Sequence, residues 1–172
     1  MTKEDIHVII TGSRNAGISS FIAQKSEDFP ANDEVGMGID IQTTSVYIND
    51  TEYSLLFYEI AGTFPLDSLK KIFQKKAVGL AVMFDISNPV SLEFAELIFN
   101  QIQEKLGSRM PKIKFLLGSH SDLPKGVSQE AIDAIMTILG GNTYYFEFSS
   151  KTGQNMVETM NQIAQKILDN AK

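Results

Sequence analysis

The sequence predicts a three-layer α/β domain built on a six-stranded, mostly parallel sheet with helices on both faces. Two features predict this class: apolar runs of strand length recur along the chain, and segments with helical periodicity separate most of them. The expected strands span residues 6–11, 39–48, 53–60, 79–85, 112–118 and 143–148. A chain of 172 residues can enclose a substantial core, so residues 1–172 are interpreted as one domain.

The expected strands differ in how they connect. The continuous apolar run at 80–84 is typical of a parallel strand that helices cover on both faces. Residues 39–48 and 53–60 are separated only by a turn-like segment around Asn49 and Asp50, which is too short for a crossover connection. These two strands are therefore expected to form one antiparallel hairpin at the edge of the sheet.

Helices are predicted where apolar residues recur at helical spacing, and these stripes are expected to face the core. One helix should begin after an Asn88 N-cap, with Pro89 at its first position, and stop at Gly107. A shorter helix-like segment spans residues 19–25. The two long stripes comprise Leu92, Ala95, Phe99, Ile102 and Leu106, and Met156, Met160, Ile163 and Ile167.

Composition narrows the class of protein. The formal net charge of −6 argues against a general nucleic-acid or anionic-membrane surface. The chain has no cysteine, so thiolate metal sites and a prenyl or palmitoyl anchor are not expected, and Thr2 is incompatible with N-myristoylation. There is no signal-peptide pattern and no apolar run near the roughly 18 residues of a membrane-spanning helix. A cytoplasmic protein without a lipid anchor is expected.

Residues 12–20 have the pattern of a phosphate-binding loop that lacks its lysine. The P-loop pattern is glycine, four residues, glycine, lysine, and then serine or threonine. Gly12, Gly17 and Ser19 fit it, but Ile18 stands at the lysine position. The loop follows a predicted strand and opens a helix-like segment, which is the context that the motif requires.

Backbone N–H groups of this loop are expected to be able to hold a phosphate at the start of the following helix. The candidate cofactor-binding residues in the loop are Gly12, Asn15, Ala16, Gly17, Ser19 and Ser20. Arg14 is a candidate replacement for the missing cation, and a solvated arginine on an exposed loop is the competing interpretation.

Five further segments follow the loop in a recognisable order: residues 38–41, 57–62, 77–87, 116–123 and 147–153. Together with the loop, they resemble the motifs of the Ras superfamily of small GTPases, in particular the Rab branch. The likeness covers the chain from about residue 6 to residue 168. It implies the P-loop small-GTPase fold and a site for GDP or GTP.

The resemblance implies that the guanine end of this site is partly retained. Asp122 stands where the aspartate of the family binds the guanine base, and Ser150 and Lys151 stand in its guanine loop. Ser119 and His120 replace the asparagine and lysine of the Gly-Asn-Lys-x-Asp motif. A local capping role is the competing interpretation of Asp122, and a plain surface position is that of His120.

The residues that the resemblance assigns to magnesium and hydrolysis are mostly replaced. Ser19 is a weak candidate ligand for Mg²⁺. Gly36 stands at the position of the first-switch threonine, Glu59 at that of the second-switch aspartate, and Thr63 at that of the glutamine that orients water. No catalytic residue is therefore assigned. Binding of GDP or GTP is expected to be weak, a role for Mg²⁺ is doubtful, and GTP hydrolysis is expected to be very weak or lost.

A surface for a protein partner is also expected. Effectors of Rab proteins contact an aromatic triad, and Ile41, Tyr58 and Phe73 match its positions. The expected partner surface comprises Ile41, Tyr58, Phe64, Leu66, Leu69 and Phe73. An exposed apolar patch of this kind marks a binding site, and the competing interpretation is that these side chains fold back over an empty nucleotide site.

Three functions are compatible with these residues. The preferred one is a pseudo-GTPase that acts as a protein-interaction or scaffold subunit. The second is a divergent GTP-binding switch in vesicle traffic or signalling, in which Arg14 compensates for the lost lysine. The third is another kind of P-loop nucleotidase, against which Asp122 and residues 149–151 argue.

Overall fold

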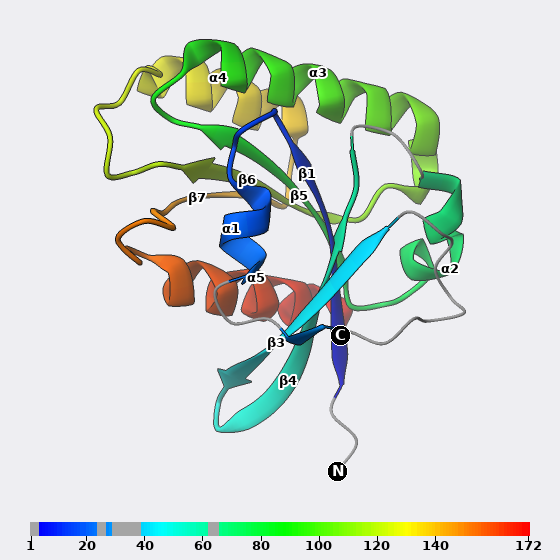
Figure 1. Ribbon diagram of the computed structural model, residues 1–172. Coiled ribbons are helices and arrows are strands. Elements are labelled where there is room, and N and C mark those ends of the chain that lie inside the picture. Colours follow the sequence, from blue (N-terminus) through cyan, green and yellow to red (C-terminus); the bar gives the residue numbers. More distant parts are fainter. Residues whose placement is uncertain (1–3, 24–26, 29–38, 62–65) are drawn as a thin grey trace.

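The computed structural model describes residues 4–23, 27–28, 39–61 and 66–172, which form a twisted sheet between two layers of helices (Figure 1). The sheet has seven strands in the order β2-β3-β4-β1-β5-β6-β7. The strands are β1 (Asp5–Gly12), β2 (Glu27–Asp28), β3 (Asp40–Ile48), β4 (Thr51–Glu59), β5 (Val78–Asp85), β6 (Ile113–Ser119) and β7 (Thr143–Glu147).

The six predicted strands are confirmed, and so is their mostly parallel arrangement. Strands β4, β1, β5, β6 and β7 pair in parallel, whereas β3 and β4 form the predicted antiparallel hairpin. The predicted strand number is too low by one, because β2 pairs with β3 at the edge. Its two residues, Glu27 and Asp28, are acidic and give no apolar strand signal.

The helices cover both faces of the sheet (Figure 1). Helices α3 and α4 cover one face together with the short α2 segment, and α1 and α5 cover the other. The helices are α1 (Ile18–Ala23), α2 (Lys70–Phe73) after the 3₁₀ turn Leu66–Leu69, α3 (Pro89–Leu106), α4 (Gln129–Leu139) and α5 (Met156–Ala171). Among the described residues, no helix is both long and apolar enough to cross a bilayer.

Local capping fixes the ends of α3 where the sequence predicts them. The Asn88 side chain accepts a hydrogen bond from the Val90 N–H group at 3.1 Å, and Pro89 occupies the first helical position. The helix stops at Gly107, whose φ of 54° is a conformation that favours glycine. Helix α4 begins in the same way, with the Ser128 hydroxyl accepting from the Ala131 N–H group at 3.1 Å.

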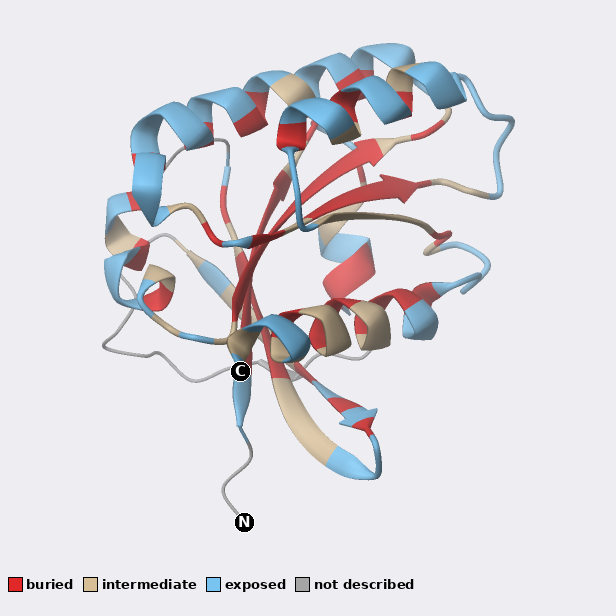
Figure 2. Cartoon of the chain, turned by 180° about the vertical axis from the view of Figure 1, so that it is seen from behind, coloured by how far each residue is buried: buried red, intermediate tan, exposed pale blue. Residues whose placement is uncertain are grey.

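The core consists of two apolar clusters on opposite faces of the sheet, and the central strands contribute to both (Figure 2). In β1, Ile9 packs toward α3, while Val8 and Ile10 pack toward α1 and α5. The two predicted helical stripes are all buried, at one face or the other. A parallel sheet covered in this way brings the carboxyl ends of its strands, and the loops that follow them, to one edge.

Candidate nucleotide-binding site

Two cavities lie along the edge where β1, β5 and β6 end, and they share Ala16, Gly17 and Ser20 of the P-loop segment. The guanine-side cavity has a volume of about 560 Å³, and its lining also includes Ser119, His120, Asp122, Leu123, Ser150 and Lys151. The phosphate-side cavity has a volume of about 480 Å³, and its lining also includes Gly12, Ser13, Arg14, Asn15, Ile18, Ser19, Asp40, Glu59, Ile60 and Ala61. The structure therefore brings together all nine predicted cofactor-binding residues along one trough.

The P-loop segment has the backbone shape of a phosphate cradle. Asn15 and Gly17 have positive φ angles of 64° and 86°, and such turns let successive N–H groups converge on an anion. The Ala16 N–H group, however, already donates to the Ser13 carbonyl at 3.1 Å. Gly12 has a packing role as well, since an added Cβ atom would collide with the Met83 carbonyl oxygen of β5.

The apolar side chain at the lysine position contacts the core and also lines the phosphate-side cavity. Ile18 is partly buried and packs against the apolar cluster of α1 and α5. Arg14 also lines the phosphate-side cavity, where its side chain is exposed, and it is the one basic residue in this lining among the residues that the structure describes. The phosphate side thus offers backbone donors without the usual fixed ammonium group.

Two carboxylates face this side of the site. The Ser19 hydroxyl donates to Oε1 of Glu59 at 3.4 Å. Burial raises the pKa of Glu59, and the negative charge of Asp40 raises it further. Hydroxyl and carboxylate oxygens are ligands that Mg²⁺ accepts. Within the described part of the chain, however, no group of three or more histidine, aspartate or glutamate residues could hold a metal ion.

The guanine-side carboxylate is held in place by a hydroxyl group. Ser149 donates its hydroxyl hydrogen to Oδ1 of Asp122 at 2.7 Å, and this hydrogen bond lowers the pKa of Asp122. The Asp122 side chain is exposed at the cavity wall, with Ser150 and Lys151 beside it. An ionised carboxylate is an acceptor suited to the paired N–H donors of a guanine base.

Ser119 does not replace the tie between this loop and the P-loop that the family asparagine makes. Its hydroxyl donates to the Phe84 carbonyl at 3.0 Å, so it can only accept the hydrogen bond that joins it to Nδ1 of His120 at 2.8 Å. Nδ1 of His120 therefore carries a hydrogen atom, and it also lies 3.5 Å from Oδ1 of Asp85. His120 is thus an oriented residue of the cavity wall and not a plain surface position.

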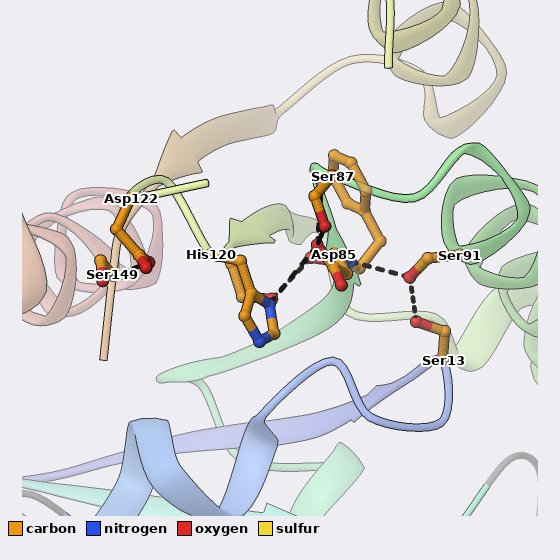
Figure 3. Close-up of polar contacts among 9 residues, drawn as sticks. Ser13, Asp85, Ser87, Ser91, His120, Asp122 and Ser149 are labelled. Atoms are coloured by element: carbon orange, nitrogen blue, oxygen red, sulfur yellow. Dashed lines mark hydrogen bonds and ion pairs between the residues drawn. The ribbon is translucent and has the colours of Figure 1, made fainter. Parts of the chain in front are cut away.

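A second set of contacts links the same region to the P-loop (Figure 3). The Asp85 N–H group donates to the Ser91 hydroxyl at 2.8 Å, and this hydroxyl contacts the hydroxyl of Ser13. Oδ1 of Asp85 also accepts from the N–H group and the hydroxyl of Ser87, at 2.8 Å and 2.6 Å. Sequence reasoning missed these residues, although Asp85 and Ser87 close one of the recognised segments.

The predicted exposed partner surface is wrong for three of its residues. Tyr58, Leu66 and Leu69 are 0%, 1% and 0% exposed and belong to the core on the α3 side. The Tyr58 hydroxyl forms a hydrogen bond with Nδ1 of His7 at 2.8 Å, so even its polar end is satisfied inside.

The remaining positions of that surface give little apolar area. Ile41 and Phe73 are partly buried and pack against the same core. Phe64 lies outside the described residues, as do Gly36 and Thr63. The described residues of this segment therefore contribute to packing and do not form an exposed apolar patch.

Comparisons with known proteins agree with this arrangement. The Ras family profile matches residues 7–169. Ras-related protein Rab-7L1 of Rattus norvegicus is 26% identical over 170 residues, covering 96% of this chain and 83% of the relative. Ras-related protein RABF2b of Arabidopsis thaliana is 25% identical over 161 residues, covering 93% of this chain and 80% of the relative.

Longer relatives also match. The Ras and EF-hand domain-containing protein of Danio rerio is 22% identical over 170 residues, which are 96% of this chain, and the chain spans only 25% of that protein. Proteins of the matched family generally bind guanine nucleotides and protein effectors. Because the family profile covers most of the sequence and the strands, helices and nucleotide trough are in place, this chain belongs to the Ras family of small GTPases, with Rab-like relatives.

Proposed function

We propose that this chain is a pseudo-GTPase, a single Ras-fold domain that acts as a protein-interaction or scaffold subunit in the cytoplasm. The observation that carries the proposal is Ile18, whose apolar side chain lines the phosphate-side cavity and packs against the core at the position where the P-loop pattern has a lysine. A charge-assisted hydrogen bond of the kind that is missing here contributes roughly 1.5–3 kcal/mol. Weak nucleotide binding and weak or absent hydrolysis follow from this loss.

The residues around the phosphate-side cavity support the same proposal. Glu59 and Asp40 line this cavity with negative charge, which would repel the negatively charged phosphates of a nucleotide. Among the described residues that line this cavity, the basic one is the exposed Arg14. The net charge of −6 favours a protein as the partner over a nucleic acid.

The alternative is a divergent switch that still binds GDP or GTP in vesicle traffic or signalling. The observation that favours it is Asp122, which Ser149 holds as an ionised carboxylate at the guanine-side cavity. In this case Arg14 would turn toward the phosphates, and Ser19 and Glu59 would share a Mg²⁺ ion with them.

The nucleotide content of the purified protein distinguishes the two functions. The protein would be purified with and without Mg²⁺ and denatured, and any released nucleotide would be identified by chromatography. The pseudo-GTPase proposal expects far less than one nucleotide per chain and no phosphate release from added GTP. Stoichiometric GDP or GTP that is lost in an Asp122→Ala variant, together with GTP turnover, would establish the switch instead.

A further inference from the structure

Helix α3 carries a second apolar stripe that faces solvent. Val90, Phe94 and Leu97 are 66%, 46% and 51% exposed. Their spacing of four and then three residues places them on one face of the helix, separate from the buried core stripe. Single exposed apolar side chains are ordinary, but an aligned set is a mark of a binding surface.

Acidic residues border this stripe. Glu93 and Glu104 are exposed, and Glu96 is half-buried, all on α3. No ion pair joins any of the three to another residue in the part of the chain that the structure describes. The only basic residue within α3 is Lys105, in its last turn. The exposed face is therefore apolar along its centre and negative along its margin.

We infer that this face of α3 is the docking site for a basic amphipathic helix of a partner protein. Such a helix would lay an apolar stripe on Val90, Phe94 and Leu97 and place lysine or arginine side chains beside the glutamates. This inference deepens the proposed function, on which it rests, by naming the surface that an interaction subunit would use. The α3 stripe also provides an exposed apolar area, which Tyr58, Leu66 and Leu69 cannot provide because they are buried.

Charge selects this occupant over two others. A second copy of the chain would bring the same glutamates against themselves when two α3 stripes met, and like charges in contact disfavour the pair. An anionic membrane would meet the same margin on a protein whose net charge is −6. A basic helix is attracted by both features.

The stripe is separate from the nucleotide trough. Val90, Phe94 and Leu97 line neither of the two cavities there. Docking is therefore expected to proceed to the same extent with or without added nucleotide, as suits a constitutive interaction subunit.

A designed peptide tests the inference directly. The probe is a fluorescein-labelled helix of about 20 residues, with leucines along one face and lysines on both flanks. The matched control peptides replace every lysine with glutamate or scramble the leucine positions. Fluorescence anisotropy gives each Kd at low and at physiological salt, and chemical-shift changes locate the contact. The lysine peptide is expected to bind at least about tenfold more tightly than either control, with shifts confined to α3 and its neighbours.

Variants of the protein separate the apolar from the charged part of the surface. Phe94→Gln with Leu97→Gln is expected to weaken the lysine peptide by about tenfold or more. Glu93→Lys with Glu104→Lys is expected to reverse the preference toward the glutamate peptide. Val157→Gln, which alters another exposed aliphatic side chain on α5, is the control that leaves binding unchanged. All the substituted side chains are exposed. Unchanged melting temperatures of the three variants verify that the fold is intact.

Equal binding of the lysine and scrambled peptides would overturn the inference, and so would lysine-peptide binding that survives Phe94→Gln with Leu97→Gln. Sedimentation showing a dimer that this double variant abolishes would also overturn it, in favour of self-association. The peptide assay and the nucleotide assay can fail separately. A chain that hydrolyses GTP and still binds the lysine peptide through α3 would refute the pseudo-GTPase proposal but leave the inference about α3 intact.

Discussion

Ile18 is the residue at which the fold and the expected chemistry diverge. Ile18→Lys should place an ammonium group at the P-loop, while the lysine stem keeps much of the apolar packing. One charge-assisted hydrogen bond to a phosphate is worth roughly 1.5–3 kcal/mol, so GDP affinity should rise about tenfold to about a hundredfold. Titration with a fluorescent GDP analogue at a fixed Mg²⁺ concentration measures this affinity, and Ile18→Met is the uncharged control. Equal affinities in the two variants would contradict the role assigned to this position.

Glu59 gives the site a pH dependence. Burial and the charge of Asp40 hold its pKa above the usual 4.5 in the folded chain. A carboxyl group with a raised folded-state pKa lowers stability wherever it is ionised in the folded protein, and this penalty disappears as the pH falls through that pKa. Glu59→Gln should therefore raise Tm at pH 7 by about 1–2 °C, a small effect because solvent screens this half-buried group.

Thermal unfolding between pH 7 and pH 4 measures this difference. The gain from Glu59→Gln should shrink toward the acid end of the range, because a falling pH protonates Glu59 first in the folded chain and then in the unfolded chain. Glu104→Gln, at an exposed position of α3, serves as the control. A gain that is as large at pH 4 as at pH 7 would show that the carboxylate charge is not its cause.

At the scale of the elements, the N-terminus of α3 depends on one side chain. Asn88→Ala removes the acceptor of the Val90 N–H group and should cost about 1 kcal/mol. For a chain of this size, Tm should fall by about 2–4 °C. Asn100→Ala, at an exposed position inside the same helix, should leave Tm unchanged or slightly higher. Circular dichroism melts of the two variants side by side provide the measurement, and equal melts would rule out the capping role.

The elements that could be predicted from the sequence are those with strong periodicity or clear caps. Strands such as β5 and helices such as α3 bury whole apolar runs, so their patterns report their positions. Strand β2 could not be found in this way, because backbone pairing with β3 holds it. Helix α4 is short and buries only Ile132, Ile135 and Leu139 along one side. Its apolar stripe is therefore too short to give a strong helical pattern in the sequence.

The site was predictable only where a motif fixes spacing along the chain. The P-loop and Asp122 follow from such motifs, whereas the Ser13–Ser91 contact joins residues 78 positions apart through the folded sheet. The error over Leu66 and Leu69 has a related cause. Apolarity shows that a side chain avoids water, but only the fold decides whether a partner or the protein's own core covers it.

At the scale of the whole molecule, the described structure rests on two apolar clusters that fill both faces of the sheet. Most residues of these clusters line neither cavity of the trough. A ligand that binds only weakly adds little to the stability of the folded state. Treatment with EDTA should therefore change Tm by less than about 1 °C, with Mg²⁺-saturated EDTA as the control. A fall of about 5 °C or more would show that a bound metal or nucleotide supports the fold.

The hydrogen atom on Nδ1 of His120 has a consequence for what the guanine-side cavity can select. An ammonium group at this position, as in the family motif, offers donors only. When the ring of His120 is uncharged, Nδ1 carries the hydrogen that Ser119 and Asp85 engage, and Nε2 keeps a lone pair at a residue that lines the cavity. At this point of the cavity wall, an uncharged His120 ring therefore favours a ligand that presents a hydrogen-bond donor over one that presents an acceptor, whereas the lysine of the family motif favours an acceptor.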